Sequence, residues 1–383
     1  MDFGLSEEQE DIVSAVREFA KKEFDIDYAR ECDQEHKVPL ELYKKAAETG
    51  FIGVHFPEEY GGQGLGIFEN TLIVEELCRA DSTLGTGTFI PKFASELILR
   101  FGNEEEKSKY LPKVASGEWV SSGMFTEPNH GTDIATSDTT AKKDNGNWII
   151  NGTKTFITNG AIADFGTTLA QTKEGAKHRG QSMIVVDDLQ KIEGVSIADV
   201  GVKFGIRCTS TCEVAFSDVA VPEENLVGQE NRGFYQAMEF FDESRIEIGS
   251  QALGIAECAF DKAVDYIKQR EQFGAKIGSF QANQFKIAEM ATKIEAARSL
   301  LYRSAWNFDQ GRIDPELTSM AKWYAGRVAV EVSDEAMQLH GGYGYMAEYD
   351  VERVYRDAKI TEIYEGTKEA QKMVISSQIL GKL

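Results

Sequence analysis

The hydrophobic period of this chain changes twice, and that change constrains the fold more than any other feature. Residues 6–9 form a capping-box pattern, and apolar residues then follow at helical spacing. Across 120–222 the spacing becomes the alternation of β-strands, and beyond it the helical spacing returns. The order predicts an α+β protein with an N-terminal helical domain at 1–119, a middle β domain at 120–228 and a C-terminal four-helix-bundle domain at 229–383.

The N-terminal helices are punctuated by glycine and proline. Helices are predicted after Pro39, over 69–80 and over 94–101. The stretch 81–92 between the last two holds two glycines and a proline, so we expect it to break the helical pattern.

Turn dipeptides mark the strands of the middle part. Asn145-Gly146 and Asn151-Gly152 are both predicted as hairpin turns between strands. After the β part, apolar residues over 287–301 step by three and four, which predicts a long bundle helix. Asp314 and Pro315 begin another.

Composition excludes several classes of protein. The 383 residues are 42% hydrophobic, which suits a globular core, and the net charge of -22 with a pI near 4.8 repels nucleic acid. Five dispersed cysteines suggest no disulfide framework, and five scattered histidines predict no metal site. The chain shows no targeting segment and no apolar run long enough to span a bilayer, so we expect a cytoplasmic protein without a membrane span.

One carboxylate near the C-terminus is a candidate general base. Glu365 lies between Tyr364 and Gly366, where the backbone can turn sharply and approach a ligand closely. An acidic residue beside a turn is more often a solvated cap. Other motifs are needed to decide between the two interpretations.

Five stretches, in this order over the whole length, resemble the acyl-CoA dehydrogenase family of flavoenzymes, in its short- and medium-chain branch. They are 56–64, 125–133, 270–274, 338–342 and 356–367. Each is modest alone, but as a set they are specific. The resemblance implies the α+β fold of that family, bound FAD and an acyl-CoA substrate.

A first group of residues is implied to bind FAD at the mouth of the β domain. By resemblance, Phe125, Thr126 and Thr132 contact the isoalloxazine ring, and Phe156 with Thr158 shields its other side. Most family members have tryptophan where Phe156 stands, so we expect flavin to be retained with altered packing.

A second group is implied to reach the FAD of a neighbouring subunit. Arg270 and Phe273 resemble residues that bind the pyrophosphate and adenine, together with Gln338 and Gly342. The resemblance therefore implies a homo-oligomer, a tetramer, although Arg270 alone would more often be an ion-pair partner. The full set implied to bind the cofactor is Phe125, Thr126, Gly131, Thr132, Phe156, Thr158, Arg270, Phe273, Gln281, Gln338, Gly341, Gly342, Thr367 and Glu369.

The acyl-CoA site is implied to lie beside Glu365. Asp242 and Arg245 resemble residues that contact the CoA arm, although a solvated ion pair on a helix face is the simpler interpretation. Some relatives carry their catalytic glutamate at the position of Ser244, so Glu365 is the implied base here. The full set implied to contact substrate is Thr132, Asp242, Arg245, Tyr364, Gly366 and Thr86.

The implied reaction is the α,β-dehydrogenation of an acyl-CoA thioester to the 2-enoyl-CoA. Glu365 removes the α-proton, hydride leaves Cβ for flavin N5, and the thioester carbonyl is held by the Glu365 N–H and a ribityl hydroxyl. Electrons then pass to electron-transferring flavoprotein. An oxidase or an enoyl-CoA reductase of the same fold remains open, as does a non-catalytic scaffold, which the intact Glu365 and Arg270 argue against.

The acyl group depends on 82–96, which by resemblance forms the floor of the acyl pocket. This stretch is slightly short of the family pattern. One hypothesis is a pocket widened for a branched or cyclic group, and another is that Lys92 meets the distal carboxylate of a dicarboxylyl-CoA. We expect instead that Lys92 points to solvent, because long lysine side chains reach water readily.

Overall fold

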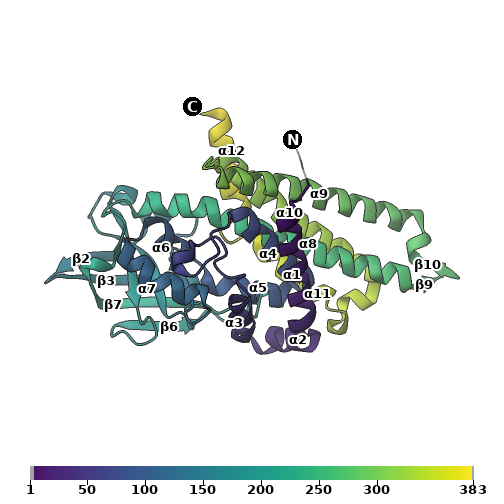
Figure 1. The fold of residues 1–383 in the computed structure, drawn as a ribbon, viewed down its shortest axis with the longest axis horizontal. Helices are drawn as coiled ribbons and strands as arrows, with labels where there is room; N and C mark the ends of the chain where they lie inside the picture. Colours follow the sequence, from purple (N-terminus) through teal and green to yellow (C-terminus); the bar gives the residue numbers. More distant parts are fainter. Residues whose placement is uncertain (1–3, 382–383) are drawn as a thin grey trace.

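The computed structural model describes residues 4–381, and its three parts follow in the predicted order (Figure 1). The twisted sheet lies at one end of the molecule, and the hairpin of β9 (Glu271–Gln272) and β10 (Ala275–Lys276) lies at the other. Helix α8 (Gly233–Gln269), with 37 residues, runs between the two ends. The predicted fold class is confirmed. The boundaries of the three domains remain a prediction.

The N-terminal part is helical, as predicted. The capping box is present, because Ser6 N–H donates to Gln9 Oε1 at 3.0 Å and Gln9 N–H donates to Ser6 Oγ at 3.2 Å. The helices are α1 (Glu7–Glu23), α2 (Ile26–Glu35), α3 (Leu40–Glu48), η1 (Glu58–Tyr60), α4 (Ile67–Ala80), α5 (Ser82–Phe89), η2 (Ile90–Lys92), α6 (Glu96–Phe101) and α7 (Glu104–Ala115).

The prediction that 81–92 breaks the helical pattern is wrong. Asp81 caps α5 by accepting from the N–H groups of Thr83 and Leu84, and all of α5 is buried. A Cβ at Gly85 would stand 2.5 Å from the backbone of Leu77 on α4. The glycine therefore serves close helix packing rather than a break, and packing overrides its low helix propensity.

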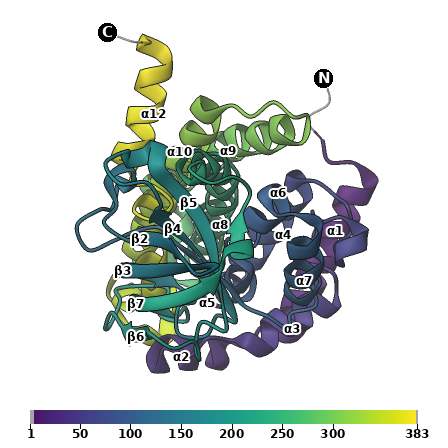
Figure 2. The ribbon, with the colours of Figure 1, turned by 90° about the vertical axis from the view of Figure 1, so that its left-hand side faces the viewer.

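The middle part is an eight-stranded sheet with the order β6-β7-β3-β2-β4-β5-β8, and β1 pairs with β4 in parallel. Figure 2 shows the sheet beside the N-terminal helices, with the C-terminal helices behind it. The strands are β1 (Ser121–Met124), β2 (Thr140–Asp144), β3 (Asn147–Thr158), β4 (Phe165–Gln171), β5 (Gln181–Asp187), β6 (Val195–Asp199), β7 (Thr211–Pro222) and β8 (Leu226–Val227), with η3 (Ile134–Thr136), η4 (Lys177–Gly180) and η5 (Glu223–Asn225).

Only one of the two predicted hairpin turns exists. Asn145-Gly146 connects β2 to β3, with Asp144 paired to Asn147. Asn151-Gly152 instead lies inside β3, where the register to β7 shifts. Gly152 has a φ of +146°, and a Cβ there would stand 2.5 Å from Thr139 Oγ1. This glycine therefore marks a bulge with close backbone approach.

The C-terminal part is a helical bundle in which α10 packs against α8, α9 and α12. The predicted seam is buried in α9 at Met290, Ile294, Ala297 and Leu301. The remaining elements are η6 (Ile277–Ser279), α9 (Gln281–Asp309), α10 (Pro315–His340), η7 (Gly341–Tyr345), η8 (Ala347–Tyr349), α11 (Val351–Ala358), η9 (Lys359–Glu362) and α12 (Lys368–Leu380).

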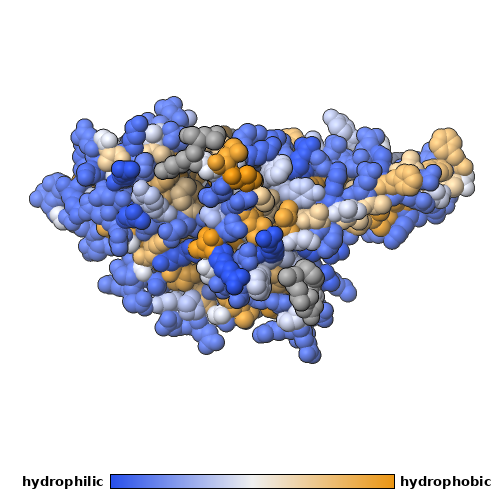
Figure 3. Space-filling view, turned by 90° about the horizontal axis from the view of Figure 1, so that it is seen from above, coloured by the Kyte–Doolittle hydropathy of each residue, from blue (hydrophilic) through white to orange (hydrophobic). Residues whose placement is uncertain are grey.

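The surface is mainly hydrophilic, with apolar side chains gathered at the end of the molecule that carries β9 and β10 (Figure 3). Phe273, in the turn of that hairpin, is 97% exposed. Among residues 4–381, no helix is long and apolar enough to cross a membrane.

Candidate active site

Glu365 lies in the short turn between η9 and α12. Its φ is +53° and that of Gly366 is +88°, so two consecutive residues adopt the left-handed conformation. For a non-glycine residue this costs about 1–2 kcal/mol, so the surroundings must hold it. Ser244, on α8, donates a 2.5 Å hydrogen bond from Oγ to Glu365 Oε2. Ser244 and Glu365, the two positions that the resemblance offered for a base, are therefore in direct contact.

The main chain of this turn offers an unused donor. Lys322 donates to the carbonyl oxygens of Tyr364 and Gly366, and Gln371 donates to those of Glu365 and Gly366. Within residues 4–381, the Glu365 N–H has no acceptor. A partly buried carboxylate thus stands beside a free N–H group that can donate to a ligand oxygen.

The protein raises the pKa of Glu365 above its ordinary value. Burial is the main cause, because it disfavours the charged carboxylate. The Ser244 hydrogen bond and the positive charges of Lys322 and Arg245 act in the opposite direction without cancelling it. A carboxylate with a raised pKa is a stronger base toward a carbon-bound proton.

Asp242 and Arg245, the predicted CoA contacts, form a buried pair one turn apart on α8. Arg245 Nη1 lies 3.1 Å from Asp242 Oδ1, which also accepts from Thr318 Oγ1 at 3.2 Å. Arg245 Nε is buried and has no partner within residues 4–381. Burial lowers the pKa of Arg245. The pair is therefore not a solvated surface pair, and its spare guanidinium donor suits an anionic or carbonyl ligand.

Thr86 and Tyr364, two predicted substrate residues, both bond to Gln251, which the sequence did not reveal. Gln251, seven residues after Ser244 on α8, donates from Nε2 to Thr86 Oγ1 at 2.8 Å. Its Oε1 accepts a hydrogen bond from the Tyr364 hydroxyl. The spacing of two helical turns from Ser244 is a usable signal, because it places both side chains on one face of α8.

The prediction that Lys92 points to solvent is wrong. Lys92 is 1% exposed, and its Nζ lies 2.6 Å from Glu96 and 2.5 Å from Glu247. Burial lowers the pKa of Lys92, but the two carboxylates outweigh this and raise it above its ordinary value. Glu247 comes from α8, so the pair is a tertiary contact that local sequence cannot reveal. With two carboxylates already bound, Lys92 has no free charge to offer a distal substrate carboxylate.

His55 lies beside this ionic cluster. Its ring nitrogens have no hydrogen-bond partner among the described residues, although Nε2 lies 3.5 Å from Glu243 and 3.8 Å from Glu96. The three side chains are close enough to ligate a cation. Lys92 and Arg100 already pair with the two carboxylates, so a metal ion would meet two positive charges.

The first group of predicted cofactor residues lies on β3 and in the loop that follows β1. Phe125 follows β1 and is buried against Phe240 and Phe241 of α8, at ring centroid distances of 5.8 and 5.1 Å. Thr126 and Thr158 are partly buried, and Gly131 and Thr132 are exposed.

Phe156 is the member of this group whose exposure and backbone conformation most need an explanation. It is 68% exposed and has a φ of +56° inside the bulged part of β3. A large aromatic ring held in water by a strained backbone is unfavourable unless something covers it. The residues present therefore fit a flat ring system such as the isoalloxazine of FAD.

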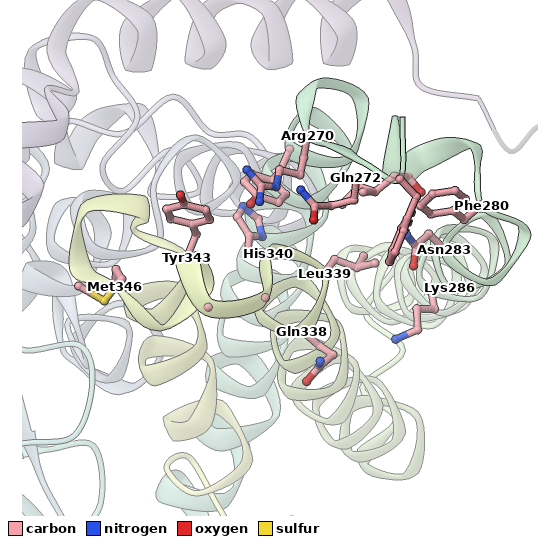
Figure 4. A pocket seen from close by; sticks show the side chains of 15 residues that line it. Arg270, Gln272, Phe280, Asn283, Lys286, Gln338, Leu339, His340, Tyr343 and Met346 are labelled. Atoms are coloured by element: carbon pink, nitrogen blue, oxygen red, sulfur yellow. Dashed lines mark hydrogen bonds between the residues drawn. The ribbon is translucent and has the colours of Figure 1, made fainter. Parts of the chain in front are cut away.

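The second group lines a cavity of about 590 Å³ between the β9–β10 hairpin, α9 and the end of α10 (Figure 4). Its lining includes Arg270, Phe273, Gln338, Gly341 and Gly342, all from the set implied to bind the cofactor, and their contact with FAD remains a prediction. The Arg270 guanidinium stands 5.3 Å from the centre of the Tyr343 ring. The cavity thus combines a cation, aromatic rings and open glycines, which suits an adenine nucleotide.

Three predicted cofactor residues belong neither to the first group nor to the lining of this cavity. Gln281 is the exposed first residue of α9, whereas Asn283 and Lys286 in the next turns line the cavity. Thr367 caps α12 by accepting from Ala370 N–H at 3.2 Å, and Glu369 is exposed. Asn283 and Lys286 are three positions apart and so share one face of α9, whereas Gln281 does not share that face.

Within one chain, the two groups lie far apart. Arg270 caps the C-terminal end of α8, 29 residues beyond Phe241, against which Phe125 of the first group packs, and the rise of 1.5 Å per residue places Arg270 about 44 Å from Phe241. Figure 1 shows the same separation, with the sheet at one end and β9 and β10 at the other. A single FAD cannot bridge this distance.

Three family models match the chain in sequence order. They are the acyl-CoA dehydrogenase N-terminal domain over residues 6–118, the middle domain over 122–219 and the C-terminal domain over 231–380. These three matches together cover almost the whole chain and define the class of the protein as a flavin-dependent oxidoreductase.

Curated relatives are similar over almost the whole chain. The short-chain specific acyl-CoA dehydrogenase of Clostridium acetobutylicum is 43% identical over 99% of this chain and 100% of its own length. Acryloyl-CoA reductase (NADH) of Anaerotignum propionicum is 41% identical, covering 99% and 96%. The Etf-complex subunit of caffeyl-CoA reductase from Acetobacterium woodii is 38% identical, covering 99% and 100%.

Solved structures agree in fold. Butyryl-CoA dehydrogenase from Megasphaera elsdenii superposes with a TM-score of 0.94 at 38% identity, covering 99% of this chain and 100% of that chain. A chain from the structure described as the electron transferring flavoprotein of Acidaminococcus fermentans gives 0.96 at 43%, with both chains fully covered. A glutaryl-CoA dehydrogenase from Mycobacterium smegmatis in complex with FADH2 gives 0.91 at 28%, covering 99% and 96%. This chain belongs to the acyl-CoA dehydrogenase family, whose members are FAD-dependent oxidoreductases.

Proposed function

We propose that the protein oxidises a short, branched or cyclic acyl-CoA thioester to its trans-2-enoyl-CoA, with Glu365 as the base. The observation that carries the proposal is the turn at Glu365, where a partly buried carboxylate with a raised pKa stands beside its own unpaired N–H. A thioester carbonyl that accepts from this N–H would have a more acidic α-hydrogen, within reach of the adjacent carboxylate.

The other residues would bind and orient the reactants. Arg245, with its unpartnered Nε, is proposed to hold the CoA arm together with Asp242 and thus to offset the net charge of -22 locally. Tyr364 and Thr86, joined through Gln251, would line the acyl pocket. Phe125, Thr126, Thr132, Phe156 and Thr158 are proposed to hold the isoalloxazine; when bound, FAD supplies a hydride acceptor at N5.

Each cofactor site is proposed to draw on two subunits of a homotetramer. The separation of about 44 Å between Phe241 and Arg270 along α8 supports this. The ring-binding group of one chain would be completed by Arg270, Phe273, Gln338 and Gly342 of another, so that the cavity of about 590 Å³ receives the adenine end.

A reductase working in the opposite direction is the second candidate. Its support is the 41% identity to acryloyl-CoA reductase and the 38% identity to the caffeyl-CoA reductase subunit. In either direction we propose electron-transferring flavoprotein as the electron carrier, since two of the similar proteins are described with it. A cytoplasmic location remains a prediction.

An anaerobic titration of the purified protein tests the function. We expect a yellow protein whose flavin absorbance bleaches with butyryl-CoA or cyclohexanecarboxyl-CoA and changes little with glutaryl-CoA, because Lys92 is already paired. Bleaching that occurs only with glutaryl-CoA would contradict the proposed substrate class. A protein that no acyl-CoA bleaches would refute the dehydrogenase. Reoxidation of the chemically reduced protein by crotonyl-CoA, faster than its reduction by butyryl-CoA, would favour the reductase.

A further inference from the structure

Lys322 lies beneath the Glu365 turn and differs from the other buried lysines. It is 1% exposed on α10, yet within residues 4–381 no carboxylate oxygen lies within ion-pair distance of its Nζ. Lys92 and Lys154, which are equally buried, each pair with a glutamate. A buried ammonium group without a carboxylate partner is costly, so its contacts need an explanation.

The contacts of Lys322 are two backbone carbonyls on either side of Glu365. Its Nζ lies 2.7 Å from the Tyr364 oxygen and 2.8 Å from the Gly366 oxygen. These bonds fix the peptide plane before Glu365 and the plane after Gly366, and so enclose the two consecutive residues with positive φ, while Gln371 holds the Glu365 oxygen between them. A side chain that is shorter or has fewer than two N–H donors could not hold both carbonyls in the same way.

Fixing these planes also fixes the direction of the Glu365 N–H. In a trans peptide the carbonyl and the N–H point to opposite sides. Because the Tyr364 carbonyl points at Lys322, the N–H of Glu365 points away from Lys322, and it has no acceptor in the described part of the chain. Lys322 therefore determines where that donor stands.

We propose that Lys322 is a positioning residue, whose ammonium group holds the Glu365 turn so that both the carboxylate and the N–H of Glu365 face the reacting thioester. This inference rests on the proposed function and adds a residue to it. Burial lowers the pKa of Lys322 to about 7, so its charge is fully present below that pH, where it lowers the pKa of the Glu365 carboxyl against the larger effect of burial. The charged or titratable groups around Glu365 are Arg245 and Glu247 on α8, Lys322 on α10, Glu362 in η9 and Tyr364.

Lys322→Met and Lys322→Arg test the inference, with Lys293→Met as the control. Lys293 also contacts α10, through Glu331 at 2.7 Å, but takes no part in the Glu365 turn. The substrate is butyryl-CoA, and the probe is 3-thiabutyryl-CoA, which has no hydrogen at its β position and so reports α-proton exchange with D2O alone. Rates are expressed per bound flavin, which removes effects on folding and cofactor content.

For Lys322→Met we expect kcat and α-proton exchange to fall about 10- to 100-fold, with a small change in KM, because a misplaced donor and base affect the transition state. In a plot of exchange rate against pH, the fall in rate on the acid side (the acid limb) should move to higher pH. Loss of the positive charge beside Glu365 raises the pKa of that carboxyl. Lys322→Arg should restore the position of that limb and part of the rate. Lys293→Met should match the wild type.

The outcomes separate the two proposals. If the wild-type protein oxidises no acyl-CoA, the proposed function fails. If the wild type is active and Lys322→Met keeps its exchange rate and acid limb per bound flavin, only the positioning role fails. Should Lys322→Met not fold, Lys322→Gln replaces it, and an unchanged acid limb in that variant would overturn the inference equally.

Discussion

Ser244→Ala isolates the hydrogen bond between α8 and the proposed base. The Ser244 hydroxyl donates to Glu365 Oε2 at 2.5 Å and so favours the charged form of that carboxyl. A hydrogen bond to a charged group contributes about 1.5–3 kcal/mol. Because Glu365 is only partly buried, the lower end applies, and about 1.5 kcal/mol corresponds to a rise of about one pKa unit.

The sign of the effect follows from the role of the base. Glu365 must be a carboxylate to remove a proton, so a raised pKa reduces the active fraction at low pH and leaves it unchanged at high pH. We expect the acid limb of kcat/KM for butyryl-CoA to move up by about one pH unit in Ser244→Ala. Well below the pKa, this corresponds to a loss of about tenfold.

Ser250→Ala is the matched control. Ser250 is also a buried serine of α8, but its hydroxyl donates to Ile246 O of the same helix at 2.8 Å. We expect its acid limb to coincide with that of the wild type. Coincident limbs for Ser244→Ala and the wild type would refute the role given to the 2.5 Å contact. Flavin absorbance of each variant shows whether the cofactor is retained.

Three further substitutions probe the rest of the site. Glu365→Gln should keep the yellow cofactor and lose turnover, and retained activity in that variant would remove Glu365 from the role of base. Arg270→Ala should lower the flavin content of the purified protein, measured by its visible-to-ultraviolet absorbance ratio; an unchanged ratio would contradict the proposed nucleotide contact. Lys92→Met would leave Glu96 and Glu247 buried without their cation and should lower the free energy of unfolding by about 3–5 kcal/mol. Urea titration measures this, and a loss below about 1 kcal/mol would show that the glutamates are neutral in the folded protein.

Local patterns in the sequence predicted most of the fold. The capping box at residues 6–9 and the seam along α9 depend on neighbours a few positions apart, so they could be identified without the structure. The glycines of 81–92 and Asn151-Gly152 misled the prediction for a common reason. Gly85 and Gly152 let the backbones of Leu77 and Thr139 approach closely, and Gly87 leaves room for the Pro39 ring, so each glycine depends on contacts outside its own segment.

The residues of the candidate site likewise fall into those that local motifs reveal and those that only the packed structure reveals. Glu365, Arg270 and Phe273 stand in recognisable motifs, and the structure places them in a polar turn and a cavity of matching character. The side chains that hold the turn could not be predicted, because Ser244 and Lys322 lie 121 and 43 positions away from Glu365 in the sequence. Ser244 contacts Glu365, and Lys322 contacts Tyr364 and Gly366, only after α8 and α10 have packed.

The distance between the two ends of α8 also determines what a lone chain can do. In the proposed assembly, two chains share each nucleotide site. An isolated chain would carry one half of each of two sites and no complete site, so bound flavin would hold neighbouring chains together. Diluting the protein would then release cofactor, and withdrawing cofactor would loosen the assembly, since each binding step strengthens the other.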